Sequence, residues 1–235
     1  MRQSEGRTGL VVGASRGLGL GLAAELQRRG WDVVATARDD AGRERIDGLA
    51  GKPGGAVRVE MLDITDDVGI AALRERLGNR VFDLVFVNAG IAGPRGRDAA
   101  SASQDEIAAV FQTNAAAPIR VARAFLDRVR DPTGVVAFMS SGLGSVADNT
   151  HGYSELYSAS KAALNSLSRS LAAKLGGRRV TVLAVAPGWV RTDIGGPSAP
   201  LGVEDSVRGI ADVLESRAGS GRHGFVDYRG RDVPW

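Results

Sequence analysis

Short apolar runs alternate with longer amphipathic stretches along the chain. The runs are rich in Val, Ala and Leu at successive positions, which is typical of strands that a parallel sheet buries on both faces. We predict strands at Gly9–Gly13, Asp32–Ala37, Ala56–Leu62, Phe82–Val87, Gly134–Met139, Val180–Ala186 and Phe225–Asp227, and helices at about 17–29, 40–50, 66–77, 103–129, 154–175 and 204–216. This alternation indicates right-handed βαβ units, and therefore an α/β fold with a doubly wound parallel sheet in a single domain over residues 1–235.

The composition excludes several classes of function. Hydrophobic residues make up 43% of the 235 residues, enough for a sizeable core, and there is no cysteine and only two histidines. We therefore expect neither disulfides nor a metal site. The net charge is only +3 and arginine is spread along the chain, so the basic face of a nucleic-acid-binding protein is not expected. Residues 1–9 lack an apolar signal region and the apolar runs are short, which predicts no membrane partner and a cytoplasmic location.

A glycine-rich turn follows the first predicted strand. Its glycines, at positions 13, 17 and 19, have the spacing G-x-x-x-G-x-G and lead directly into a predicted helix. Glycines allow a tight turn and let a pyrophosphate approach the helix N-terminus, where the partial positive charge of the helix stabilises it. A turn with no ligand is the alternative, but its place between the first strand and the first helix favours dinucleotide binding.

The end of the second predicted strand bears on cofactor choice. A site for NAD often has an acid there that binds the ribose 2′-hydroxyl, whereas this chain has Thr36-Ala37-Arg38 and no acid before Asp39. Arg16 supplies a second cation from the glycine turn. Two guanidinium groups suit a 2′-phosphate, so we predict NADP(H) in preference to NAD(H).

Tyr157 and Lys161 are the main candidates for chemistry. They are four residues apart at the start of a strong helical pattern, so both side chains can face one cleft. A nearby ammonium group favours the phenolate, so we expect Lys161 to lower the tyrosine pKa towards neutral pH. Ser140 and Ser141 end the fifth predicted strand, at the sheet edge where ligands bind, and a serine hydroxyl there can hydrogen-bond a carbonyl oxygen. Taken alone, Tyr157 and Lys161 could also be an ordinary pair on the protein surface.

Two further polar positions stand out. Asn88-Ala89-Gly90 ends the fourth predicted strand, where small residues leave room for a cofactor. Asn114 lies inside a helical pattern, where asparagine is unfavourable, so we expect it to have a buried partner such as a water chain.

Together these motifs resemble the classical short-chain dehydrogenase/reductase family. The matching segments are GASRGLG at 13–19, NAG at 88–90, Asn114, the Ser141 region, YSASK at 157–161 and PGWVRTD at 187–193, in the family's order along the whole chain. The resemblance implies a single-domain Rossmann-type sheet of about seven strands in the order 3-2-1-4-5-6-7, with helices on both faces and a short substrate loop at about 193–204. It also implies a homodimer or homotetramer.

The resemblance implies a role for each matching residue. Tyr157 would be the general acid/base, Lys161 would bind the nicotinamide ribose, Ser141 would hold the substrate oxygen and Asn114 would support a proton relay. The implied cofactor-binding residues are Gly13, Ser15, Arg16, Gly17, Leu18, Gly19, Arg38, Asp63, Ile64, Asn88, Ala89, Gly90, Tyr157, Lys161, Pro187, Gly188, Val190 and Thr192. Among these, Asp63 and Ile64 would contact the adenine ring and Thr192 would lie near the carboxamide.

Some features depart from the common family pattern. Val12 stands where the family often has threonine, and Ser141 lies 16 residues before Tyr157, a longer step than in most members. The added segment 144–153, SKAALN at 160–165 and the ending Pro234-Trp235 resemble a subgroup that contains sniffer-type carbonyl reductases and C-factor-like proteins. Candidate pocket residues are Gly93, Leu143, His151, Tyr153 and Trp189, whose apolar and aromatic character predicts an apolar or aromatic carbonyl or alcohol substrate. For His151, a plain loop position is an equal alternative.

These observations predict an NADPH-dependent oxidoreductase that reduces a ketone or aldehyde, or reversibly oxidises an alcohol. The main alternative is a C-factor-like signalling or scaffold protein that binds NAD(P) with little turnover. A sugar epimerase or dehydratase would have a larger C-terminal substrate region than the roughly 45 residues that follow Thr192 here. An enoyl reductase would usually have a different spacing around its tyrosine and lysine.

Overall fold

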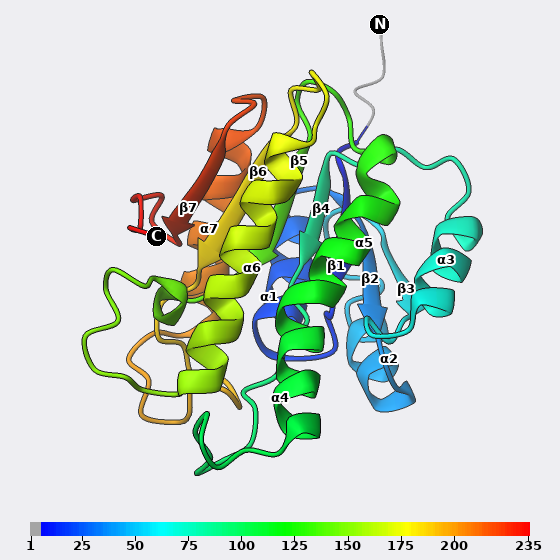
Figure 1. Ribbon diagram of the computed structural model, residues 1–235. Coiled ribbons are helices and arrows are strands. Elements are labelled where there is room, and N and C mark those ends of the chain that lie inside the picture. Colours follow the sequence, from blue (N-terminus) through cyan, green and yellow to red (C-terminus); the bar gives the residue numbers. More distant parts are fainter. Residues whose placement is uncertain (1–5) are drawn as a thin grey trace, which may run out of the picture.

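Seven parallel strands form the centre of the protein. We describe residues 6–235 from a computed structural model. Residues 1–5, part of the 1–9 segment that was expected to lack a signal region, lie outside the described range. The strands are β1 (Thr8–Val12), β2 (Asp32–Ala37), β3 (Val57–Met61), β4 (Leu84–Val87), β5 (Val135–Met139), β6 (Thr181–Ala186) and β7 (His223–Asp227). Their order in the sheet is β3-β2-β1-β4-β5-β6-β7, which confirms the predicted doubly wound topology (Figure 1).

Helices cover both faces of this sheet. They are α1 (Gly17–Arg28), α2 (Asp40–Asp47), α3 (Asp67–Arg76), α4 (Gln104–Phe111), α5 (Ala117–Phe125), α6 (Glu155–Ala173) and α7 (Val203–Arg217). One core cluster joins the strands to α3, α5 and α6, and the other joins them to α1, α2 and α7. The central strands β4, β5 and β6 are fully buried, because each presents apolar side chains to both layers, whereas the edge strands β3 and β7 are only partly buried.

The long predicted helix over 103–129 is wrong in detail. The structure has α4, a π-helical turn at Gln112–Ala116, α5 and a 3₁₀ turn at Leu126–Arg128 instead. Hydrophobic periodicity cannot separate these forms, since they differ by only a fraction of a residue per turn. The seventh strand is also longer than predicted, because pairing with β6 begins at His223.

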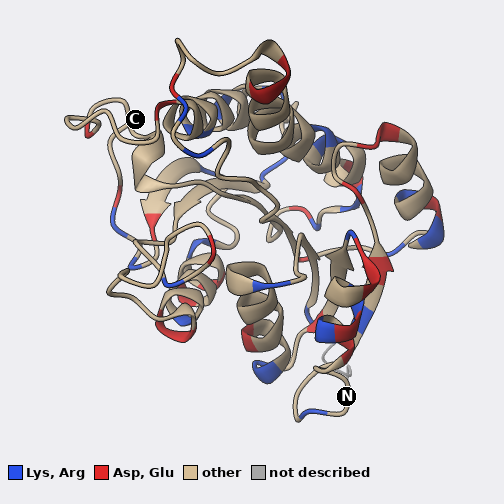
Figure 2. Cartoon of the chain, turned by 90° about the horizontal axis from the view of Figure 1, so that it is seen from below, with Lys and Arg blue, Asp and Glu red and all other residues tan. Residues whose placement is uncertain are grey.

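The strands all point the same way, so their carboxyl ends meet at the lower edge of the sheet in Figure 1. The segments that follow β1, β4, β5 and β6 therefore gather there, although they are far apart in sequence. Viewed from this edge, Lys and Arg are interspersed with Asp and Glu around the periphery (Figure 2). Among the described residues, no helix is long and apolar enough to cross a membrane.

Candidate active site

The glycine turn after β1 is held from two neighbouring strands. Thr36 Oγ1, from β2, accepts a hydrogen bond from the Gly13 amide at 2.9 Å, and Asn88 Nδ2, after β4, donates to the Gly13 carbonyl at 2.7 Å. Gly13 has a φ of +84°, and a Cβ atom there would lie 2.7 Å from the Ala89 backbone nitrogen. The close approach of these backbones explains the glycine, and it gives Asn88 a bracing role that the sequence did not suggest.

The N-terminus of α1 differs from those of the next three helices. Asp39, Asp66 and Ser103 each accept a hydrogen bond from a first-turn amide of α2, α3 and α4. Helix α1 has no such side-chain cap and no acid in its first turn. Its amides and the positive end of its dipole are therefore available to an anion, which fits the pyrophosphate of a dinucleotide.

Replacement of Gly19 by alanine is expected to damage both fold and binding. A Cβ atom at Gly19 would overlap the carbonyl oxygen of Gly13 and approach Asn88 Nδ2 to 2.6 Å. Overpacking of this kind costs about 1–3 kcal/mol, and we expect NADPH binding to weaken as the turn shifts. Chemical denaturation and a cofactor titration measure both effects. Gly48→Ala, at an exposed helix end, is the control; equal behaviour of the two variants would contradict the prediction.

The two predicted phosphate-binding arginines have different surroundings. Arg38 is exposed at the end of β2, and the next residue, Asp39, is engaged in capping α2. Arg16 instead forms an ion pair with Asp193, in the segment after β6. Both partners of that pair are largely exposed, so the interaction is weak and screened by salt. Binding of a 2′-phosphate by Arg16 would have to compete with Asp193, a partner that the sequence did not reveal.

The predicted adenine-binding pair lies after β3. Thr65 donates to the Asp63 carboxylate through both its amide and its hydroxyl, at 2.8 and 2.7 Å. These bonds, and to a lesser extent the charge of Arg38, hold the pKa of Asp63 below its usual value. Ile64, in contrast, has its side chain in the core, so it would offer a cofactor mainly its backbone.

Tyr157 and Lys161 lie on one face of α6, as their spacing requires. The ammonium nitrogen of Lys161 is 5.7 Å from the centre of the Tyr157 ring and donates to the Met139 carbonyl at 2.9 Å. Lys161 is only 2% exposed. Its side chain therefore runs beneath the ends of β4 and β5, where a Cβ atom at Gly90 would lie 3.3 Å from the ammonium group.

Burial dominates the electrostatics of this pair. It raises the pKa of Tyr157 above the ordinary value, and a hydrogen bond with Ser141 lowers that pKa in part. Burial lowers the pKa of Lys161 to about 8. The expectation that Lys161 would lower the Tyr157 pKa is therefore not met in the protein alone, because desolvation raises that pKa and the only opposing cause is the Ser141 hydrogen bond.

The buried lysine predicts an unusual pH dependence of stability. Between pH 8 and 10.5 the unfolded chain keeps the Lys161 proton and the folded protein does not, so the free energy of unfolding rises with pH across this window. The rise is on the order of 3 kcal/mol, since each tenfold change in proton affinity is about 1.4 kcal/mol. Chemical denaturation of wild type and Lys161→Met from pH 7 to 10.5 isolates this rise. If the free energy of unfolding of the two proteins changed in parallel with pH, the prediction would be wrong. Lys174→Met, at an exposed position, is the control.

The two serines after β5 have separate partners. Ser141 is the one beside Tyr157, and its hydroxyl also accepts the Leu143 amide at 3.2 Å. Ser140 points into the protein, where its hydroxyl donates to Asn165 Oδ1 at 2.7 Å. The arrangement favours Ser141 over Ser140 as the group that holds a substrate oxygen.

Asn114 lies in the π-helical turn and is fully buried. Its amide oxygen accepts from the Ile91 amide at 2.8 Å, and its amide nitrogen donates to the Ile91 carbonyl and to Ser160 Oγ, at 2.8 and 3.0 Å. The side chain thus ties the loop after β4 to α6. Both amide protons have partners, so a proton relay at this position would use the Asn114 backbone.

The predicted nicotinamide segment follows β6. The carbonyl of Pro187 accepts from Ser206 of α7, Gly188 has a φ of +82°, and Val190 is buried and bridges to Leu201. Thr192 is close to the glycine turn: its methyl group would lie 3.5 Å from a Cβ atom at Gly17. The segment therefore passes close to the start of α1.

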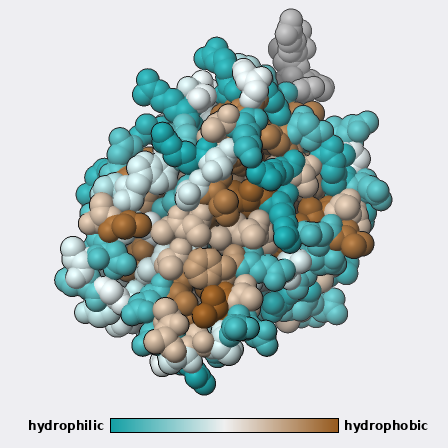
Figure 3. All heavy atoms as spheres, in the orientation of Figure 1, coloured by the Kyte–Doolittle hydropathy of each residue, from teal (hydrophilic) through white to brown (hydrophobic). Residues whose placement is uncertain are grey.

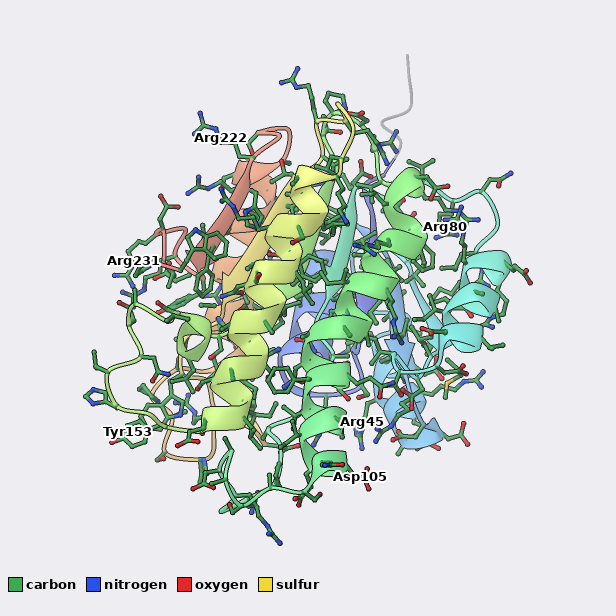
Figure 4. All side chains as sticks on the ribbon, in the orientation of Figure 1. Arg45, Arg80, Asp105, Tyr153, Arg222 and Arg231 are labelled. Carbon is green, nitrogen blue, oxygen red and sulfur yellow. The ribbon has the colours of Figure 1, made fainter. Side chains whose placement is uncertain are left out.

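Large apolar side chains are exposed in the two segments that follow β5 and β6. They are Leu143, Val146 and Tyr153 in the first segment, and Trp189 and Ile194 in the second. Trp189 is fixed by a 2.7 Å hydrogen bond from its indole nitrogen to the Gly195 carbonyl. Tyr153 projects outward from the 144–153 segment beside His151, with ring centres 5.7 Å apart (Figure 4). Gly93 lines a separate hollow against Val110 of α4.

Comparison with known proteins identifies the family. A family model described as enoyl-(acyl carrier protein) reductase matches residues 13–215. A putative short-chain dehydrogenase/reductase from Burkholderia multivorans, solved with bound NADP, is 46% identical, with a TM-score of 0.93 over 97% of this chain and 99% of that one. This chain belongs to the short-chain dehydrogenase/reductase family. It is an oxidoreductase of that family, as its motifs predicted.

Two further members of the short-chain dehydrogenase/reductase family bear on the predicted subgroup. The carbonyl reductase Sniffer of Drosophila melanogaster is 29% identical, with a TM-score of 0.80 over 98% of this chain and 100% of that one. The C-signal protein of Myxococcus xanthus is 38% identical over 154 residues, which are 65% of this chain and 92% of that protein. Both kinds of relative that the sequence suggested are thus similar to this chain.

Proposed function

We propose that this protein is an NADPH-dependent carbonyl reductase that acts on apolar or aromatic ketones and aldehydes. The observation that carries the proposal is the group formed by Tyr157, Ser141 and the buried Lys161, beside a glycine turn built for a dinucleotide. The NADP bound to the Burkholderia protein and the carbonyl reductase activity named for Sniffer support it.

Tyr157, Ser141 and Lys161 would have different roles in such a reduction. A nicotinamide cofactor, when bound, would supply the hydride for the carbonyl carbon. Tyr157 donates its proton to the carbonyl oxygen, and Ser141 donates a hydrogen bond to the same oxygen as negative charge develops there. Lys161, beneath the ends of β4 and β5, is placed to bind the nicotinamide ribose. The raised pKa keeps Tyr157 protonated, as a general acid requires.

Exposed apolar residues in the segments after β5 and β6 support the proposed substrate class. Leu143 and Val146 follow Ser141 in the first segment, and Trp189 lies in the second. An apolar or aromatic substrate would cover them and gain from that burial.

The decisive experiment measures NADPH oxidation with a panel of aromatic aldehydes, aliphatic ketones, quinones, a small charged keto acid and an enoyl thioester. We expect turnover with the apolar carbonyl compounds. Strict preference for the charged keto acid would overturn the substrate class. Turnover of the enoyl thioester alone would favour the second candidate, enoyl reduction, which the description of the matching family model suggests. NADPH binding without turnover would favour a role like that of the C-signal relative.

We also propose a homo-oligomer that pairs the α4–α6 face. Apolar atoms gather in the middle of this face (Figure 3), and Leu167 of α6 is among its exposed residues. Light scattering of the purified protein tests this, and a monomer at micromolar concentration would refute it.

A further inference from the structure

A buried asparagine lies on the catalytic face of α6. Asn165 is one helical turn beyond Lys161 and two beyond Tyr157, and it is 3% exposed. Its amide oxygen accepts from Ser140 Oγ at 2.7 Å, and its amide nitrogen donates to the Gly144 carbonyl at 3.1 Å. One side chain therefore holds both ends of the short segment that contains Ser141.

The segment itself has little structure of its own. Between Ser141 and Ser145 it forms a single 3₁₀ turn, with backbone bonds from Gly144 to Ser141 and from Ser145 to Gly142. Isolated turns of this kind are weakly stable. The turn rests directly on α6, because a Cβ atom at Gly144 would lie 2.9 Å from the Cβ of Lys161. The contact with α6, and with Asn165 in particular, therefore decides where the Ser141 hydroxyl lies.

We infer that Asn165 is a positioning residue, which sets the place of the Ser141 hydroxyl relative to the Tyr157 hydroxyl. Helix α6 carries both Tyr157 and the amide that fixes the Ser141 turn, so a rigid element defines the distance between the two groups. This inference rests on the proposed function, in which both hydroxyls bind the same substrate oxygen. In this role the buried Asn165 acts through Ser140 and Gly144.

The helix also offers a matched control. Ser168, almost one turn further along α6, is fully buried and bonds the Asn165 carbonyl at 2.7 Å and His223 Nε2 at 3.0 Å. Neither of these hydrogen bonds reaches the Ser141 turn. Ser168→Ala should therefore reveal the cost of losing a buried polar group on this helix without moving Ser141.

The test compares Asn165→Leu and Asn165→Asp with Ser168→Ala in steady-state kinetics. Leucine has a similar volume and removes the hydrogen bonds to both Ser140 and Gly144. Aspartate keeps the acceptor for Ser140, but it replaces the donor to the Gly144 carbonyl with an oxygen atom. We expect kcat to fall about tenfold or more in both, a loss of about 1.4 kcal/mol of transition-state stabilisation. NADPH affinity should be unchanged. The alkaline limb of the kcat profile should move to higher pH, because the Ser141 hydrogen bond that lowers the Tyr157 pKa is weakened.

The inference would be overturned if both Asn165 variants kept the wild-type kcat and the wild-type pH profile. The proposed function would still stand in that case, provided that Tyr157→Phe is inactive. If the wild-type protein turns over no substrate, the proposed function fails. The role of Asn165 in holding the Ser141 turn can then still be tested by amide hydrogen exchange. Faster exchange of the amides of 141–145 in Asn165→Leu than in Ser168→Ala would then support the hold on the turn. Equal exchange in the two variants would refute it.

Discussion

Tyr157→Phe is expected to lower kcat for carbonyl reduction about 10³-fold, within the range that a single general acid contributes. The substitution removes one oxygen and leaves the ring in place over Lys161, 5.7 Å from its ammonium group. Ser141 and the rest of the cleft remain, so residual activity above the uncatalysed rate is expected.

The control for this variant is Tyr153→Phe, the same chemical change in an exposed ring of the 144–153 segment. It should retain kcat, with at most a change in KM. NADPH affinity, measured by fluorescence titration, should be similar in Tyr157→Phe and wild type, since the hydroxyl is one of many cofactor contacts. Equal kcat in Tyr157→Phe and wild type would show that another group delivers the proton.

Arg38→Leu is expected to weaken NADPH binding by about 10- to 100-fold, corresponding to about 1.5–3 kcal/mol for a hydrogen bond to a charged group. NADH binding should hardly change, because NADH lacks the 2′-phosphate. Arg38 is the better placed of the two arginines, since it is exposed at the end of β2 while Arg16 is paired with Asp193. Isothermal titration with both cofactors measures the difference.

Arg43→Leu, on the exposed side of α2, serves as its control and removes the same charge from the same region. Its only recorded ion pair among the described residues is a 3.9 Å contact with Asp47. If Arg38→Leu and Arg43→Leu weaken NADPH equally, the effect is one of net charge and not of a specific phosphate contact. Equal losses for NADH and NADPH in Arg38→Leu would place Arg38 away from the 2′-phosphate.

The sequence by itself determined the sheet and the place of the chemistry. The apolar sequences of strands such as Leu84–Val87 and Val135–Met139 predict burial on both faces of the sheet. The alternation of strands with helices predicts that the strands are parallel. Tyr157 and Lys161 share a helix face by spacing alone. The glycine turn is also recognisable from local sequence, because glycine readily adopts the φ of +84° found at position 13.

Only the tertiary structure decided the contacts between segments that are distant in sequence. The side-chain amide of Asn114, in the π-helical turn, bonds Ile91 and Ser160, which are 23 and 46 residues away. Asn165 had a signal in the sequence, a polar residue at i+4 from Lys161, but its partners come from another segment. The pKa values of Tyr157 and Lys161 likewise follow from burial, which no local pattern measures. Local spacing thus fixes which side chains share an element, whereas the packing of elements fixes their charge, their partners and their separation.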